Sequence, residues 1–255
     1  MKLSIVVPMF NEAENVPRIR AELLPVVHEL AQLHDVEVIL VDDGSTDGTG
    51  VRLASAFKHL GGAQLRFVFL RHQTNCGLGA ALQTGFAASI GDAIVTVDSD
   101  GGNAFREIPS LLSYLTPGVD IVTASPYHPG GRVEGIPAYR LLLSRACSLG
   151  YRLLVDRRVH TYTCLFRAFR RSVIESLAIE RAGHLAVTEL LVKAMLQGYR
   201  VAEYPAVLRR RSLGSSKVNL IRTIWDHLRF QAFLALARMT VRPLASQPER
   251  HKLLS

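Results

Sequence analysis

The sequence has few cysteines and no long apolar run. Its three cysteines, Cys76, Cys147 and Cys164, are far apart and form no CxxC motif or Cys/His cluster. This pattern argues against a disulfide framework and indicates reduced thiols in a cytosolic protein. No apolar stretch reaches the roughly eighteen residues of a transmembrane helix. The first eight residues are too short for a signal-peptide core, so we interpret them as a first strand.

A nucleic-acid-binding motif is also missing, although the chain carries a formal net charge of +8. We find no basic segment interleaved with aromatic residues and no recognition helix. The expected partners therefore do not include nucleic acid. Two classes of anionic partner are left that would explain the positive charge: an anionic lipid surface and a phosphorylated small molecule.

The first half of the chain alternates between strand and helix patterns. Strands are predicted at residues 3–7, 36–41, 65–70, 93–97 and 119–124, and helices at 12–33, 49–59, 79–89 and 105–115. This alternation predicts an α/β domain with a mostly parallel sheet covered by helices on both faces.

The second half is less regular. It contains a predicted loop at 125–137, helices at 139–154, 184–197 and 219–239, and a basic loop at 209–217. The final helix is amphipathic, which leaves two interpretations open: packing on the core, or lying on an anionic membrane surface. Its charged face carries Arg222, Asp226 and Arg229. Its apolar face carries Ile221, Ile224, Trp225, Leu228, Ala232, Leu236 and Met239.

Carboxylates follow two of the predicted strands. Asp42 and Asp43 come after the second strand, and Asp98 and Asp100 come after the fourth. The carboxyl ends of parallel strands meet at one edge of a sheet, where ligands bind. Like charges gathered there would repel one another, which favours a cation or a set of hydrogen-bond donors between them. We therefore expect Asp98 and Asp100 to hold a hard divalent cation that bridges the phosphates of a nucleotide.

Two further segments fit a nucleotide site. The second carboxylate of Asp42-Asp43-Gly44-Ser45 is able to accept hydrogen bonds from a base or ribose, although residues 45–47 also suit a helix N-cap. The segment 75–79, Asn-Cys-Gly-Leu-Gly, precedes a predicted helix, and its backbone N–H groups are candidates to bind phosphate.

Together these segments resemble family 2 glycosyltransferases. The matching residues are 5–12 (IVVPMFNE), 41–47 (VDDGSTD), Asn75-x-Gly77 and Asp98-Ser99-Asp100. More narrowly, the chain resembles the dolichyl-phosphate mannose synthase group, which transfers a sugar from a nucleotide to a polyprenyl phosphate. The resemblance implies a fold of the GT-A type over residues 1–217, followed by an amphipathic helix and basic tail over 218–255. It also implies inversion at the anomeric carbon and a peripheral position on the cytoplasmic face of the membrane.

The resemblance also assigns site residues. The nucleoside pocket corresponds to Pro8, Asn11, Glu12, Val41 and Asp43, and the diphosphate with Mg²⁺ or Mn²⁺ to Asp98 and Asp100. The acceptor-phosphate site corresponds to Arg140 and Ser144, in the spacing Arg-x-x-x-Ser, and the late basic loop to Arg211 and Lys217. The expected partners are a GDP- or UDP-sugar donor, a polyprenyl phosphate and an anionic membrane surface.

Three departures leave the sugar and the acceptor open. Gly101-Gly102-Asn103 follows the aspartates where the group has Leu-Gln-His, so a glutamine ligand is missing at Gly102. Residues 125–127 read Ser-Pro-Tyr instead of Ser-Arg-Tyr; one phosphate-binding arginine is absent, and Arg132 is the candidate to replace it. Residues 164–167 read Cys-Leu-Phe-Arg instead of Ser-Gly-Phe-Arg.

The acceptor decides which residues are catalytic. A phosphate acceptor needs no strong base, because a phosphate monoester with a second pKa of about 6 is largely dianionic near neutral pH. A hydroxyl acceptor needs a carboxylate base, for which Glu189 is the candidate. Glu189 is also spaced to pair with Lys193 on a helix. A third alternative, a non-catalytic nucleotide-sugar-binding protein, is suggested by residues 101–103 and opposed by the intact Asp98 and Asp100.

The histidines complete the set of polar candidates. His72, His128 and His184 show no metal-ligand spacing among them, and we interpret them as ordinary polar residues.

Overall fold

The structure, a computed structural model, describes residues 1–210 and 220–240 of the chain. Arg211, Lys217 and the predicted basic tail lie outside the described residues. The described strands are β1 (Lys2–Met9), β2 (Asp35–Asp42), β3 (Leu65–Arg71), β4 (Ala93–Thr96), β5 (Ile121–Ser125), β6 (Arg132–Glu134), β7 (Arg167–Arg170), β8 (Val201–Pro205) and β9 (Val207–Arg209). The described helices are α1 (Val16–Ala31), α2 (Thr49–Phe57), α3 (Leu78–Ala88), the 3₁₀ helix η1 (Phe105–Glu107), α4 (Ile108–Ser113), α5 (Ala138–Leu154), α6 (Arg171–Ser176), α7 (Leu185–Leu196) and α8 (Leu220–Thr240).

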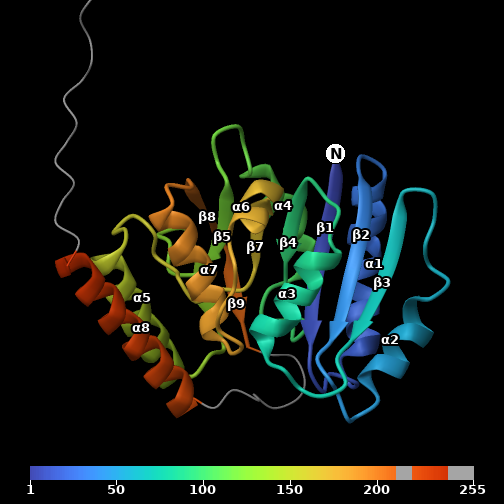
Figure 1. Cartoon of the computed structure of the whole chain (residues 1–255). Coiled ribbons are helices and arrows are strands. Elements are labelled where there is room, and N and C mark those ends of the chain that lie inside the picture. The colour runs from blue at the N-terminus through green and yellow to red at the C-terminus, as the bar shows by residue number, and fades with distance from the viewer. Residues whose placement is uncertain (211–219, 241–255) are drawn as a thin grey trace, which may run out of the picture.

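Seven strands form one sheet in the order β3-β2-β1-β4-β7-β5-β8 (Figure 1). The sheet is parallel except for β7, which runs antiparallel to both β4 and β5. β6 and β9 pair in parallel as a separate two-stranded sheet. The predicted, mostly parallel α/β architecture is confirmed.

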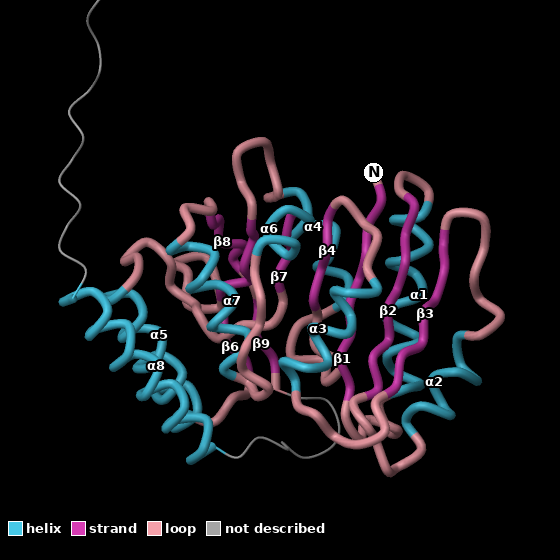
Figure 2. The backbone as a smooth tube through the Cα atoms, viewed as in Figure 1, coloured by secondary structure: helices cyan, strands magenta, loops and turns pink. Residues whose placement is uncertain are grey.

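Two apolar layers hold the helices on the sheet. Ile5 and Val7 of β1 face the layer that α1 covers, whereas Val6, between them, faces the layer that α3 covers. This alternation follows from the two-residue period of a strand. Both layers consist of buried aliphatic and aromatic side chains, which fix the positions of the strand ends that carry polar residues. Figure 2 shows helices on both sides of the strands.

The structure differs from the predicted elements mainly in the second half. β6 lies inside the segment predicted as a loop, and β7, β8 and β9 were not predicted. These strands have three to five residues each, and β7 reads Arg-Ala-Phe-Arg, with arginine at both ends. Such short segments carry too little hydrophobic periodicity to be recognised, and pairing with neighbouring strands determines their conformation.

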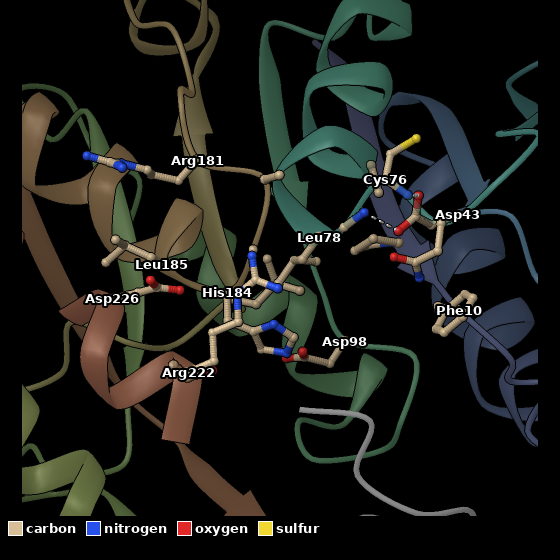
Figure 3. Close-up of a pocket in the computed structure, with 18 of the residues that line it drawn as sticks. Phe10, Asp43, Cys76, Leu78, Asp98, Arg181, His184, Leu185, Arg222 and Asp226 are labelled. Carbon is tan, nitrogen blue, oxygen red and sulfur yellow. Dashed lines mark hydrogen bonds between the residues drawn. The ribbon is translucent and has the colours of Figure 1, made fainter. Parts of the chain in front are cut away.

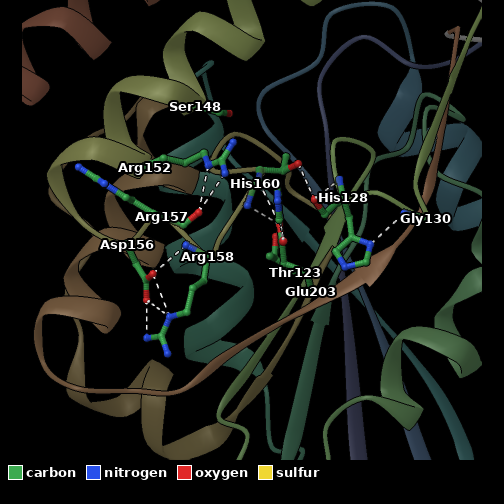
Figure 4. Close-up of polar contacts among 12 residues, drawn as sticks. Thr123, His128, Gly130, Ser148, Arg152, Asp156, Arg157, Arg158, His160 and Glu203 are labelled. Carbon is green, nitrogen blue, oxygen red and sulfur yellow. Dashed lines mark hydrogen bonds and ion pairs between the residues drawn. The ribbon is translucent and has the colours of Figure 1, made fainter.

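The carboxylate of Glu203 binds the segment that connects α5 to β7. Glu203 of β8 accepts hydrogen bonds from the backbone N–H groups of His160 and Thr161 at 2.8 and 3.1 Å. Its other oxygen lies 2.6 Å from Nδ1 of His160 (Figure 4). On the same segment, Arg158 pairs with Asp156 at 2.7 Å. These contacts fix a long connection that has no regular structure of its own.

Helix α8 packs along α5 (Figure 1). The hydroxyl of Tyr151 lies 2.9 Å from Nδ1 of His227, and the side-chain amide of Gln231 donates to the carbonyl of Cys147 at 2.9 Å. Burial lowers the pKa of His227 to about 4, which keeps the imidazole neutral at neutral pH. Helix α8 therefore packs on the protein through His227, Phe230 and Gln231. Ile221, Trp225, Leu228 and Leu236 of the predicted apolar face are exposed, so the interpretation that this face packs on the core is wrong for most of its residues. Within the described residues, no helix has the length and apolar character that crossing a membrane requires.

Candidate functional site

A cavity of about 960 Å³ opens at the carboxyl ends of the central strands. Its walls come from the ends of β1, β2 and β4, from the start of α3, from residues 180–185 and from α8. Figure 3 shows residues from both halves of the chain around this space. Carboxylates and arginines alternate along the walls, which is the composition expected for a phosphorylated ligand with a cation.

Asp98 and Asp100 lie in this cavity, on the segment that leaves β4. Ser99, between them, is buried, and its carbonyl accepts a hydrogen bond from Arg18. Asp100 Oδ1 accepts a hydrogen bond from the Gly102 N–H at 2.8 Å. This local bracing directs two carboxylates into the same space without further help from the core.

Asn103, which follows the Asp98-Ser99-Asp100 motif, contacts the first of its two carboxylates. Asn103 is 2% exposed, and its amide nitrogen lies 3.3 Å from Oδ2 of Asp98. Its buried oxygen, Oδ1, has no hydrogen-bond partner among the described residues. The two carboxylates of Asp98 and Asp100 are oxygen ligands, which is the kind that Mg²⁺ and Mn²⁺ prefer. The residues present therefore fit a hard divalent cation, although the glutamine expected at Gly102 is missing.

Asp43 lines the cavity and also fastens a loop. Its carboxylate accepts hydrogen bonds from the N–H groups of Cys76 and Gly77 at 2.9 and 2.8 Å. His72 Nδ1 lies 2.7 Å from the same carboxylate. The contact of Asp43 with a nucleoside stays a prediction. The structure shows a second role: Asp43 holds the 76–77 loop in place as part of the cavity wall.

Three of the N–H groups in residues 75–79, the segment suggested to bind phosphate, are engaged within the protein. The N–H groups of Cys76 and Gly77 are already bound to Asp43, and the N–H of Gly79 donates to the carbonyl of Ala182 at 2.6 Å. A Cβ atom on Gly79 would come within 1.9 Å of the carbonyl oxygen of Arg181. The glycines therefore allow a close approach between this loop and residues 181–182, which joins the two halves of the cavity.

The remaining nucleoside residues divide into two groups. Pro8 and Glu12 line the cavity as predicted. Val41 is fully buried in the apolar layer under α3, so its side chain does not reach the cavity. Asn11 has a left-handed backbone, with φ at 54°, and its Oδ1 accepts a hydrogen bond from the Thr46 N–H at 2.8 Å. Asn11 thus holds the loop after β1 against the loop after β2.

The acceptor-phosphate residues are not among the described residues that line this cavity. Arg132 is exposed on β6, and Arg140 is exposed at the start of α5. Ser144, one turn further along α5, lies 3.1 Å from the hydroxyl of Thr163. The structure therefore does not bring Arg132, Arg140 and Ser144 together with Asp98.

Arg167, the arginine of the altered Cys-Leu-Phe-Arg segment, is a core residue. It is 1% exposed, and its guanidinium donates to Thr123 Oγ1 at 3.1 Å and to the Tyr162 carbonyl at 2.7 Å. Burial lowers its pKa to about 10, so the guanidinium remains charged at neutral pH. Arg167 therefore ties β5 and β7 to the segment before them.

Glu189 pairs with Lys193, as the four-residue spacing predicted. The two side chains are 2.8 Å apart, and Glu189 is 1% exposed. Its other oxygen accepts hydrogen bonds from the N–H groups of Glu180 and Arg181 at 3.1 and 3.0 Å. Glu189 is absent from the described cavity walls. The carboxylate therefore supports the turn that forms part of the cavity wall.

Several cavity residues were not assigned from the sequence. Arg222, Asp226 and Arg229 of α8 and His184 before α7 all line the cavity. Figure 3 shows His184 and Arg222 directed toward Asp98. The charged face of α8 was visible in the sequence, but its direction depends on how α8 packs on α5. His184, interpreted as an ordinary polar residue, lies beside the proposed cation site.

The chain is similar to known proteins over most of its length. The model of glycosyl transferase family 2 matches residues 4–178. Polyprenol monophosphomannose synthase of Mycolicibacterium smegmatis is 35% identical over 222 residues, covering 84% of this chain and 80% of that protein. Dolichol-phosphate mannosyltransferase of Pyrococcus furiosus is 29% identical over 231 residues, covering 90% of this chain but 62% of the longer relative.

The fold has solved counterparts. Glucosyl-3-phosphoglycerate synthase from Mycobacterium tuberculosis, solved with Mn²⁺ and UDP, superposes with a TM-score of 0.67 at 21% identity, covering 93% of this chain and 79% of that one. Mannosyl-3-phosphoglycerate synthase from Rubrobacter xylanophilus gives a TM-score of 0.66 at 18% identity, covering 97% and 78%. These likenesses concern the fold, which is of the GT-A type. With the family match covering more than half of its length, the chain belongs to glycosyl transferase family 2.

Proposed function

We propose that this protein transfers a sugar from a nucleotide-sugar donor to a polyprenyl phosphate, with inversion at the anomeric carbon. The observation that most directly supports this proposal is the position of Asp98 and Asp100. Both lie at a strand end, in a cavity that is also lined by arginines of α8. The polyprenol monophosphomannose synthase of M. smegmatis, similar over most of both chains, supports the polyprenyl phosphate as acceptor.

The donor would span the cavity from β1 to β4. Pro8, Glu12 and Asp43 surround the nucleoside end, and Asp98 and Asp100 lie at the diphosphate end. Mg²⁺ or Mn²⁺ held by these two aspartates would neutralise the charge that develops on the leaving diphosphate. Arg222 and Arg229, on the opposite wall, supply further positive charge to the same phosphates.

The acceptor phosphate would attack the sugar directly. Because it is largely dianionic at neutral pH, the protein has to position it and need not remove a proton. We assign this positioning to Arg140 and Ser144 of α5 with Arg211 and Lys217. For Arg140 and Ser144 this requires the start of α5 to approach the cavity when the acceptor binds. Arg132 on β6 remains the candidate for the missing arginine of the 125–127 segment.

A hydroxyl acceptor is the weaker alternative. It needs a general base within hydrogen-bonding reach of the attacking oxygen. Glu189 is buried, paired with Lys193 and bound to two backbone N–H groups, so its lone pairs are engaged in holding the 180–181 turn. The structure therefore favours an acceptor that brings its own negative charge.

The donor and metal assignments are tested together by a donor panel. UDP- and GDP-sugars are incubated with the protein and polyprenyl phosphate, with Mg²⁺ or Mn²⁺ and separately with EDTA. We expect one nucleotide to support lipid glycosylation and EDTA to abolish it. Full activity in EDTA contradicts the cation assignment, and no transfer from any nucleotide sugar contradicts the proposed function.

The protein also exposes an apolar surface on α5 and α8, which we name the α5/α8 face. Its residues are Tyr139, Leu142, Leu149, Leu153, Ile221, Trp225, Leu228, Phe233 and Leu236, all exposed. Arg140, Arg145 and Arg238 are exposed on the same two helices. Exposed apolar residues bordered by arginines fit the surface of an anionic bilayer. A polyprenyl phosphate is anchored in such a bilayer, so we propose that this face rests on it.

Replacing Ile221 and Trp225 with serine is expected to weaken binding to anionic phospholipid vesicles by at least about tenfold. Each large apolar side chain that enters the bilayer contributes roughly 1.5–3 kcal/mol, and about 1.4 kcal/mol corresponds to tenfold. The matched control replaces Leu33 and Val51, which are equally exposed on the other side of the fold. Co-sedimentation measures the effect. If both double variants lose vesicle binding equally, or if the protein binds only neutral vesicles, the α5/α8 face is not the membrane-binding surface.

A further inference from the structure

Three side chains of different chemistry meet at the nucleoside end of the cavity. A carboxylate oxygen of Asp43, a ring nitrogen of His72 and the sulfur of Cys76 all lie within 4.8 Å of one another. Asp43 is buried, His72 is half-buried and Cys76 is exposed. From this geometry we propose that Asp43, His72 and Cys76 bind a thiophilic divalent cation of the Zn²⁺ type, which occupies the nucleoside end of the donor cavity.

The ligand atoms are close to the arrangement that Zn²⁺ needs. Tetrahedral bonds of about 2.0–2.3 Å place neighbouring ligand atoms roughly 3.3–3.6 Å apart. Asp43 Oδ1 and His72 Nδ1 are now 2.7 Å apart and would separate slightly, while the sulfur would move inward. The Cys76 N–H is already bound to Asp43 Oδ1 at 2.9 Å, which anchors the thiol-bearing residue beside the other two ligands. Small side-chain rotations are therefore sufficient.

The second ring nitrogen of His72 has a hydrogen-bond acceptor beside it, as a metal-bound histidine usually does. His72 Nε2 lies 2.8 Å from the hydroxyl of Thr84 on α3. When Nδ1 binds a metal, the imidazole stays neutral with its proton on Nε2, which then donates to Thr84 Oγ1. Such an outer contact fixes the ring orientation of a metal-bound histidine. The thiol of Cys76 releases its proton as the thiolate binds the cation.

This site differs in chemistry from the one at Asp98 and Asp100. Thiolate and imidazole select Zn²⁺, whereas carboxylates and amide oxygens suit Mg²⁺ and Mn²⁺. The other two cysteines do not compete, because burial raises the pKa of Cys147 and of Cys164 to about 12 and keeps both as thiols. A thiophilic cation should therefore select Cys76.

Occupation of the site has a consequence for the donor. Asp43 and Cys76 both line the cavity, so the cation and the nucleoside would compete for the same carboxylate. Metal binding itself does not depend on the proposed function; its effect on nucleotide affinity does. Because linkage is reciprocal, nucleotide should weaken Zn²⁺ binding by the same factor by which Zn²⁺ weakens nucleotide binding.

The test is a Co²⁺ titration of the reduced full-length protein without sugar or lipid. A thiolate–Co²⁺ charge-transfer band should appear in the near ultraviolet and disappear when Zn²⁺ is added, because Zn²⁺ binds more tightly than Co²⁺. Cys76→Ser should remove the band, and Cys147→Ser, the matched control, should retain it. Thr84→Val should weaken Co²⁺ binding by about 10- to 100-fold, the usual effect of losing an outer contact, whereas Thr84→Ser should not.

Two outcomes overturn the proposal. No band at a large excess of Co²⁺, or a band that persists in Cys76→Ser, shows that these residues do not form the site. If the band forms but calorimetry finds the same UDP or GDP affinity with and without Zn²⁺, the cation does not occupy the nucleoside end of the cavity. Failure of sugar transfer would leave the Co²⁺ result standing, so the two proposals fail separately.

Discussion

Replacing Asp100 with alanine is expected to lower sugar transfer by roughly a hundredfold or more, the usual cost of removing a group that offsets developing charge in a transition state. Asp100 lies in the cavity at the end of β4, and its side chain contacts the following turn instead of the apolar core. The free energy of unfolding should therefore change little. Transfer assays and thermal unfolding on the same preparation measure both.

The matched control is Asp92→Asn, at the opposite end of the same strand. Asp92 accepts a hydrogen bond from the Lys2 N–H at 2.8 Å, and asparagine can still accept it. We expect normal transfer from this variant. If Asp100→Ala keeps wild-type activity, or loses activity only because it unfolds, the proposed cation site is not where catalysis occurs.

The second large effect is expected at the acceptor. Arg140→Ala and Arg211→Ala should each slow acceptor-dependent turnover about ten- to hundredfold at saturating donor. A guanidinium makes two parallel hydrogen bonds to phosphate oxygens, and losing such a charged contact costs roughly 1.5–3 kcal/mol. Donor hydrolysis, if it occurs, should change much less.

Arg152→Ala is the control for this pair of variants. Arg152 lies further along α5, where its guanidinium donates to the Arg157 carbonyl at 3.2 Å, away from the cavity walls. Turnover of this variant should match the wild type. If Arg140→Ala and Arg211→Ala use polyprenyl phosphate as well as Arg152→Ala does, the acceptor phosphate binds elsewhere, and the arginines of α8 become the alternative.

The N-terminal half of the fold could be predicted because its central strands, β1 and β2, are buried on both faces. Runs such as residues 38–41 (Val-Ile-Leu-Val) are continuously apolar and end in polar residues, so both their type and their C-terminal limit are encoded locally. β7 could not be predicted, because Arg167 is hydrophilic and yet buried, with its guanidinium donating to the Thr123 hydroxyl and to the carbonyls of Tyr162 and Val187. The antiparallel insertion of β7 between β4 and β5 depends on pairing across the sheet.

The site was predictable where the chemistry follows directly from a strand end. Asp98 and Asp100 satisfy this condition, and the Glu189–Lys193 pair follows from helix spacing. Val41 was misplaced because its side chain, although on the α3 face of the sheet, lies under α3, a packing that the local sequence does not show. His184 and Arg222 could not be assigned, because their direction toward Asp98 depends on the packing of α7 and α8.

The central claim, transfer to a lipid phosphate, is tested most directly by comparing two acceptors that differ only in that phosphate. The protein is given its preferred nucleotide sugar, a divalent cation, and either polyprenyl phosphate or the corresponding polyprenol, and the lipid products are identified by mass spectrometry. We predict one added hexose on polyprenyl phosphate and none on polyprenol. Glycosylated polyprenol, or sugar transferred only to a saccharide hydroxyl, would contradict the account. Glu189 would then again be the candidate for the general base.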